Sequence, residues 1–83
     1  MHENKSLVEL DQGQEGIIVS IQGGRTLRRR LSDMCIAPGA KIRKISESFL
    51  GGPVTIQIGH ARTALGFGMA EKIMIEAEEG AEQ

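Results

Sequence analysis

A chain of 83 residues can form one small domain, and at this size folding buries only about 60% of the unfolded surface. Its ten basic and eleven acidic residues nearly cancel, and two phenylalanines are its only aromatic residues, which argues against nucleic acid as a partner. One cysteine excludes an intrachain disulfide and a four-cysteine zinc site, and predicts a reducing, cytoplasmic compartment. The polar N-terminus and the lack of an apolar run of about 18 residues predict no signal peptide and no membrane insertion.

The first part of the chain predicts a short strand, a turn and a longer strand. Leucine and then glycine recur at every third position, at Leu7, Leu10, Gly13 and Gly16. We interpret this spacing as a short strand, a tight turn over residues 11–13, and a bend or bulge at Gly16. The β-branched run over residues 15–22 predicts the longer strand. Its buried face is expected to consist of Ile17, Val19 and Ile21.

Residues 23–39 read GGRTLRRRLSDMCIAPG and predict one amphipathic helix over about residues 24–35. Its apolar stripe consists of Leu27, Leu31 and Met34, and its opposite side carries Arg25, Arg28 and Arg29. Thr26 is a candidate cap near the start, and the Pro38-Gly39 pair cannot continue the helix. A helix of about three turns is unstable alone, so the apolar stripe must pack against the rest of the domain.

The remaining chain predicts short strands. Residues 40–49 carry two isoleucines at an odd spacing, which predicts a bulge near residues 43–44. The reversal at residues 51–53 joins this strand to the alternating residues 54–58, so the two form a hairpin.

The C-terminal part predicts three more short elements and a tail. Residues 60–65 are expected to pair as a strand, followed by a helical turn near residues 68–72 and a closing strand that contains Ile73 and Ile75. The domain is therefore expected to span residues 1–77. Residues 78–83 are acidic and small, and predict a frayed tail.

These elements predict a mainly β fold: a small, partly open β-barrel of five to six short strands with one amphipathic helix. The chain has no room for a second layer of helices, and curling a sheet into a barrel removes most of its exposed edges. The core is expected to contain Ile17, Val19, Ile21, Leu27, Leu31, Val54, Ile56, Ile58, Ile73 and Ile75.

The residues predict no catalytic or metal site, and no cofactor is expected. Cys35 and His60 are the candidate metal ligands, but two ligands fall short of the three or four that transition-metal sites use. We interpret Cys35 as a semi-buried packing residue and His60 as a turn or surface residue. Neither a phosphate-binding glycine loop nor a catalytic grouping of Ser, His and acid occurs.

Two surface features are candidates for partner binding. The side of the helix with Arg25, Arg28 and Arg29 is either a solvated surface, on which Arg29 pairs with Asp33, or a docking face for an acidic partner. Phe49 and Leu50 beside the reversal either fold under the hairpin or meet a partner. The residues alone leave both alternatives open.

Three strings of the sequence resemble the FeoA family, the small cytosolic proteins of bacterial ferrous-iron uptake. They are RRRLSDMCIAPG at residues 28–39, GGPV at residues 51–54, and R-x-A-L-G-x-x-x-A-E-K-I at residues 62–73. The leucine and glycine spacing near the N-terminus is also similar. The resemblance covers about residues 6–76, and its parts occur in the family order.

The resemblance implies an SH3-like barrel that works with FeoB, a membrane protein whose cytosolic portion is a GTPase. One departure concerns Cys35, where the family usually has glycine. Glycine would end the helix in a left-handed conformation, which costs a cysteine about 1 kcal/mol or more. Either the helix therefore extends one residue further, or its cap is strained.

Two functions follow from these observations. The favoured one is a non-enzymatic adaptor that binds the cytosolic part of a FeoB-like transporter and modulates its activity or assembly. The alternative is a metal-responsive or ligand-binding barrel that resembles the accessory domain of iron-dependent repressors. The sequence leaves open whether the barrel is a monomer or a weak homo-oligomer.

Overall fold

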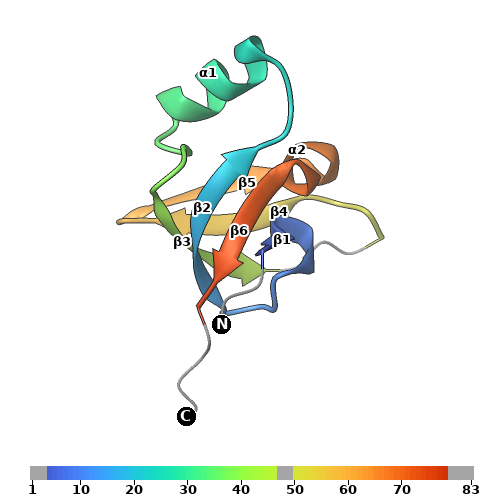
Figure 1. Cartoon of the computed structure of the whole chain (residues 1–83). Coiled ribbons are helices and arrows are strands. Elements are labelled where there is room, and N and C mark those ends of the chain that lie inside the picture. The colour runs from blue at the N-terminus through green and yellow to red at the C-terminus, as the bar shows by residue number, and fades with distance from the viewer. Residues whose placement is uncertain (1–3, 47–49, 79–83) are drawn as a thin grey trace.

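The computed structural model describes residues 4–46 and 50–78. Six strands, one 3-10 turn (η1) and two helices follow one another in these ranges (Figure 1). They are β1 (Asn4–Ser6), η1 (Leu7–Glu9), β2 (Glu15–Ile21), α1 (Arg25–Asp33), β3 (Lys41–Ser46), β4 (Val54–Ile58), β5 (Ala61–Leu65), α2 (Phe67–Glu71) and β6 (Ile73–Ala77).

The strands form one antiparallel sheet in the order β1-β6-β2-β3-β4-β5. The mainly β fold with six short strands and one substantial helix is therefore confirmed. The sheet curls around its core, and α1 lies at one end of it, at the top of Figure 1. The chain leaves the sheet after β2 and forms α1. It then returns to the sheet beside β2, where the Ile18 amide donates to the Ala40 carbonyl (2.9 Å) just before β3 begins.

The core is almost entirely aliphatic. It contains the buried side chains of Leu7, Leu10, Ile18, Ile21, Leu31, Ile36, Ile42, Val54, Ile56, Leu65, Ala70, Ile73, Ile75 and Ala77. Six of the ten predicted core residues are fully buried, namely Ile21, Leu31, Val54, Ile56, Ile73 and Ile75. Leu27 and Ile58 are partly buried and pack against this cluster. The other two, both in β2, do not follow the prediction.

The predicted buried face of β2 is wrong for Ile17 and Val19 and confirmed for Ile21. Ile17 is half-buried and Val19 is 36% exposed, whereas Ile18 and Ile21 lie in the core. The pairing with β6 shifts between Ile18 and Ser20, so Val19 is an extra residue in a bulge. A bulge changes which side chains face inward, because it breaks the strict alternation of a strand.

The predicted first strand is also wrong, because Leu7 and Leu10 belong to η1 and its C-cap. A 3-10 helix has three residues per turn, so side chains three apart lie on the same side, and both leucines point into the core. Ser6 caps the turn through its side chain, which accepts from the Val8 amide, and Glu9 accepts from the Ser6 amide at 2.9 Å. The spacing of three is thus a helical period.

The predicted turn at residues 11–13 is confirmed, but Gly16 has a different role. The Gln14 amide donates to the Asp11 carbonyl (2.9 Å), and Gly13 has a φ of 87°. Gly16 lies within β2, opposite Ala77. A Cβ atom there would meet the Ile75 side chain and lie 2.8 Å from the Glu76 carbonyl oxygen. Gly16 therefore permits β6 to approach closely, and it marks no bend.

A bulge interrupts β3 as predicted, one residue further along than expected. The pairing with β4 shifts between Lys44 and Ser46. Ile42 and Lys44 are both buried, so this lysine occupies a core position. Its Nζ donates to the carbonyl oxygens of Val8 (3.0 Å) and Leu10 (2.7 Å). Lys44 thereby ties β3 to the η1 segment.

The helix α1 ends in a Schellman motif centred on Cys35. The Cys35 amide donates to the Ser32 carbonyl (2.9 Å), and the Ile36 amide donates to the Leu31 carbonyl (2.8 Å). Leu31 and Ile36 are both fully buried, which supplies the hydrophobic contact typical of this motif. Cys35 has a φ of 67°, so the strained cap, and not a longer helix, is the correct alternative.

Three other expectations for the helix need correction. Its N-cap is Gly24, which has no side-chain bond, so Thr26 is not the cap. Met34 is 39% exposed and lies outside the core. Cys35 is exposed and not semi-buried, because a left-handed C-terminal residue turns its side chain away from the helix stripe.

Cys35→Gly is expected to stabilise the protein by about 1 kcal/mol. Glycine adopts a φ near 67° without steric cost, and the exposed thiol makes no packing contribution that would be lost. Thermal and urea unfolding of the parent and the variant measure the difference, with Cys35→Ser as the control that removes the thiol but keeps the Cβ atom. A Cys35→Gly protein less stable than Cys35→Ser would contradict this account.

The C-terminal elements follow the predicted order. β4 and β5 form a hairpin whose turn is Gly59-His60, so His60 is an exposed turn residue as expected. The second helix, α2, covers Phe67–Glu71 and so begins one residue before the expected turn. In the expected tail, the Glu78 amide donates to the Glu15 carbonyl (2.9 Å) and thus continues the sheet. Residues 79–83 lie outside the described ranges.

Candidate functional site

An arginine face covers the outer side of α1. It consists of Arg25, Arg28 and Arg29, and Arg30 of the same helix is exposed as well. The Arg28 Nη1 atom donates to the Gly23 carbonyl (2.7 Å) and reinforces the start of the helix. Within residues 4–46 and 50–78, none of these arginines forms an ion pair, and the expected pair of Arg29 with Asp33 does not form. At the helical period Arg30 projects roughly 160° away from Arg28, so it lies outside the arginine face.

Leu50 lies apart from the arginine face, in the loop between β3 and β4. Its side chain is 90% exposed, so it does not fold under the hairpin. Its φ is 55°, a left-handed value that is unusual for leucine, and the next residue, Gly51, has a φ of 75°. Figure 1 shows this loop at the right of the barrel and α1 at the top, so the two features do not form one continuous patch. Phe49 lies outside the described residues.

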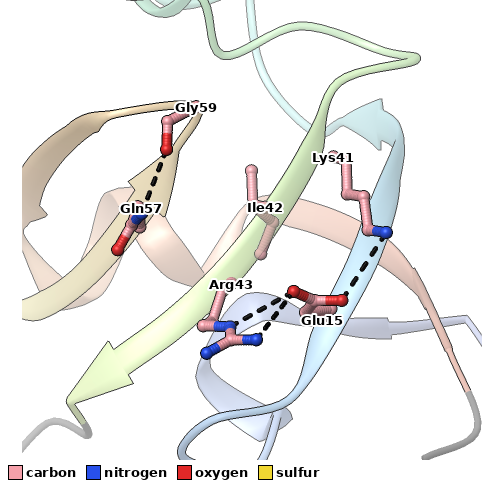
Figure 2. Close-up of a pocket in the computed structure, with 6 residues that line it drawn as sticks. All are labelled: Glu15, Lys41, Ile42, Arg43, Gln57 and Gly59. Atoms are coloured by element: carbon pink, nitrogen blue, oxygen red, sulfur yellow. Dashed lines mark hydrogen bonds and ion pairs between the residues drawn. The ribbon is translucent and has the colours of Figure 1, made fainter.

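A shallow charged groove of about 530 Å3 crosses the outer surface of β2, β3 and β4 (Figure 2). Its lining consists of Glu15, Lys41, Ile42, Arg43, Gln57 and Gly59. Arg43 holds Glu15 through Nε (3.2 Å) and Nη2 (3.0 Å), and Lys41 Nζ approaches the other oxygen of Glu15 at 3.6 Å. The motif analysis missed this groove, because its residues come from three strands and the turn after β4, and only the strand register brings them together.

The charges in the groove support one another. The hydrogen bond from Arg43 and the positive charge of Lys41 lower the pKa of Glu15 below its ordinary value of 4.5. The negative charges of Glu78 and Glu15 raise the pKa of Lys41. Lys41 and Arg43 are exposed and Glu15 and Glu78 are half-buried, so solvent still screens the interactions. The cluster therefore orders the surface more than it stabilises the fold.

Cys35 and His60 are not grouped with further metal ligands. Both are exposed, Cys35 at the end of α1 and His60 in the turn between β4 and β5. Within the described ranges, no three side chains of His, Cys, Asp or Glu lie close enough to hold a metal ion. None of the helices in these ranges is long and apolar enough to cross a membrane.

These features define a small β-barrel whose distinctive chemistry lies on its surface, in a charged helix and an exposed loop. The sequence matches the family described as the FeoA domain over residues 5–77. A relative from Methanocaldococcus jannaschii, named Fe(2+) transport protein A, is 39% identical over 72 residues, which are 86% of this chain and 85% of the relative. The chain therefore belongs to the FeoA family.

Solved structures agree with this assignment. The crystal structure of an iron uptake regulatory protein, FeoA, matches with a TM-score of 0.84 and 37% identity, over 92% of this chain and all of that one. Stenotrophomonas maltophilia FeoA, described as an SH3 domain protein and complexed with zinc, matches with a TM-score of 0.74 and 24% identity, over 92% and 98% of the two chains. The SH3-like fold is thus confirmed.

A manganese-dependent transcriptional repressor shares the fold as well. It matches with a TM-score of 0.83 at 18% identity, over 94% of this chain and 44% of the repressor. At this identity the likeness concerns the fold alone. It carries no functional residue over to this chain.

Proposed function

We propose that this protein is a non-enzymatic adaptor of ferrous-iron uptake in the cytoplasm. It binds the cytosolic, GTPase-containing part of a FeoB-like transporter and modulates the activity or assembly of that transporter. Membership of the FeoA family and the likeness to a named Fe(2+) transport protein support a role in ferrous-iron transport. The partner and the mode of action are our inference.

The observation that carries the proposal is the arginine face. Three exposed arginines on one side of α1, and a fourth elsewhere on the same helix, have no acid partner in the described ranges, which is unexpected on a protein whose net charge is −1. Such a surface attracts an acidic partner through long-range electrostatics and so speeds association. Guanidinium groups also form bidentate hydrogen bonds with carboxylates. We therefore assign the arginine face to the encounter with an acidic surface on the transporter.

Leu50 supplies the apolar contact that arginines lack. A leucine that is 90% exposed and held at a φ of 55° stands away from the barrel at a cost in backbone energy, which is typical of a binding residue. Phe49, its neighbour in the sequence, is proposed as a second anchor. Because the loop and α1 lie apart, the partner must contact the barrel at two separate places.

Binding kinetics with the purified cytosolic part of the transporter test this proposal. The double variant Arg25→Gln/Arg29→Gln is expected to associate more slowly and with a weaker dependence on salt, because it removes long-range attraction. Leu50→Ala is expected to dissociate faster and to weaken binding by about 1–3 kcal/mol. Phe49→Ala is expected to act in the same direction.

Matched controls come from the exposed residues Lys72 and Met34 and the half-buried Lys5. Lys5→Gln/Lys72→Gln removes two positive charges outside α1, and Met34→Ala truncates another partly exposed apolar side chain. If the association rate constant falls equally in the arginine variant and in its lysine control, only net charge matters, and the arginine face is not the docking surface. Strong, stoichiometric binding of ferrous iron by the isolated barrel would instead favour the metal-responsive alternative.

A further inference from the structure

β5 is an end strand of the sheet, and the direction of its backbone groups can be derived from the register. The Lys44 amide donates to the Gln14 carbonyl (3.0 Å), so the backbone of Lys44 faces β2. The backbone N–H and C=O groups of successive residues in a strand face opposite neighbouring strands. The backbone of Arg43 therefore faces β4 and bonds to its partner Gln57. The backbone of Gln57 therefore faces β3, and the residue opposite it on β5, Arg62, faces away from β4.

The hairpin turn leads to the same assignment. Ile58 pairs with Ala61 across the two-residue turn Gly59-His60, and Gly59 has a φ of 60°. In such a turn the closing pair is hydrogen-bonded, so Ala61, Thr63 and Leu65 bond to β4. Arg62 and Ala64 consequently present two amides and two carbonyls at the outer edge of β5. No hydrogen bond in the described ranges occupies these four groups.

We call this outer side of β5 the open edge. A row of polar side chains runs across the outer surface of the sheet and ends there. Cross-strand pairing aligns Glu15 on β2, Arg43 on β3, Gln57 on β4 and Arg62 on β5. Arg43 Nη2 donates to Glu15 (3.0 Å), and the side-chain Nε2 of Gln57 donates to the Gly59 carbonyl (3.0 Å). Figure 2 draws both contacts. Arg62, exposed and last in the row, forms no ion pair within the described ranges.

We propose that the open edge of β5 is a strand-addition site for an extended, acidic segment of the protein partner. The segment would bond to the free backbone groups of Arg62 and Ala64 and extend the sheet by one strand. Its residue opposite Arg62 carries a carboxylate, which continues the row of charges. Its residue opposite Ala64 has a bulky side chain, because alanine leaves space there.

This inference rests on the proposed function, since it specifies how the transporter engages the barrel. A second copy of this chain is a poorer occupant. Two β5 strands centred on Thr63 would place Arg62 opposite Ala64 of the other copy, and both arginines would lack an acid. An arginine on an edge strand is also a common device against pairing between identical copies. The charge therefore favours an acidic partner.

Amide hydrogen exchange, followed by NMR on the 15N-labelled protein, tests the proposal directly. The probes are the transporter's whole cytosolic part and overlapping synthetic 12-residue peptides from its sequence. On binding, the Arg62 and Ala64 amides are expected to exchange at least tenfold more slowly. The Thr63 amide, already bonded to β4, is the internal reference.

Two variants extend the test. Arg62→Glu is expected to weaken binding at least tenfold, whereas Lys72→Glu, an equal charge change at the end of α2, is not. Ala64→Pro removes one free donor, and the β4 ladder keeps its bonds because this amide faces outward. Protection of the Thr63 amide reports whether each variant retains the hairpin.

The outcomes separate this proposal from the proposed function. Binding of the cytosolic part without protection of Arg62 and Ala64, and without an effect of Arg62→Glu, overturns the strand-addition site and leaves the adaptor role intact. Failure of the cytosolic part to bind, while acidic peptides protect both amides, overturns the adaptor role alone. If neither probe binds, both proposals fail. Protection that grows with the protein's own concentration identifies a second copy as the occupant and overturns the acidic partner.

Discussion

Leu31→Ala is expected to lower the free energy of unfolding by about 2–5 kcal/mol, enough to threaten a domain of this size. Leu31 is the one fully buried side chain of α1, and its carbonyl accepts from the amide of Ile36, another core residue, at the end of the helix (2.8 Å). Removing three carbon atoms there leaves a cavity at the place where α1 is attached to the barrel. The helix should therefore loosen together with the core.

Urea unfolding followed by circular dichroism measures this effect. Leu27→Ala is the matched control, because Leu27 lies on the same helix and is only partly buried. It should cost clearly less than Leu31→Ala. Equal losses in the two variants would mean that the end of α1 is not anchored through Leu31, and a Leu31→Ala protein as stable as the parent would refute its place in the core.

Lys44→Met is expected to destabilise the protein by about 2–4 kcal/mol although it places an apolar side chain in an apolar position. The methionine fills a similar volume, but the carbonyl oxygens of Val8 and Leu10 lose the ammonium group that donates to them at 3.0 and 2.7 Å. An acceptor left without a donor in a buried site costs about 1–3 kcal/mol. Both lost hydrogen bonds hold the η1 segment, so this segment is expected to unfold locally before the rest of the domain.

The control for this prediction is Lys41→Met, on the same strand. Lys41 is exposed and its ion pairs are screened by solvent, so its replacement should change stability far less. Hydrogen exchange at the amides near Leu10 would reveal the local opening. Should Lys44→Met equal the parent in both stability and exchange, the two carbonyl contacts contribute nothing, and Lys44 is only a space-filling residue.

The order of elements and the barrel could be predicted because they depend on local patterns. The alternation at residues 54–58 and the glycine turns act within a few residues, and each predicted strand or turn from residue 40 onward occurs close to its expected place. The shared side of Arg25, Arg28 and Arg29 on α1 could also be predicted, because the helical period alone determines it. Leu50 was named from its position beside a reversal, and it is exposed.

The inward face of β2 could not be predicted in this way. Ile17, Ile18 and Val19 are all β-branched, so composition does not distinguish the two sides of the strand. The bulge at Val19 arises from the pairing with β6, more than fifty residues later in the chain. The role of Gly16 has the same origin, because only the approach of β6 leaves no space for a Cβ atom.

The sequence by itself determined the family, the strands from β2 to β6, the amphipathic helix and the chemistry of its charged side, because motif order and hydrophobic period are local properties. Only the tertiary structure decided which isoleucines of β2 enter the core and that Lys44 is buried. It also decided that the row of polar side chains that begins at Glu15 ends with Arg62 at the open edge of β5. These features depend on strand register, which is set only when strands distant in the sequence pair with each other. That pairing also determines which backbone groups are bonded and which remain free at an edge of the sheet.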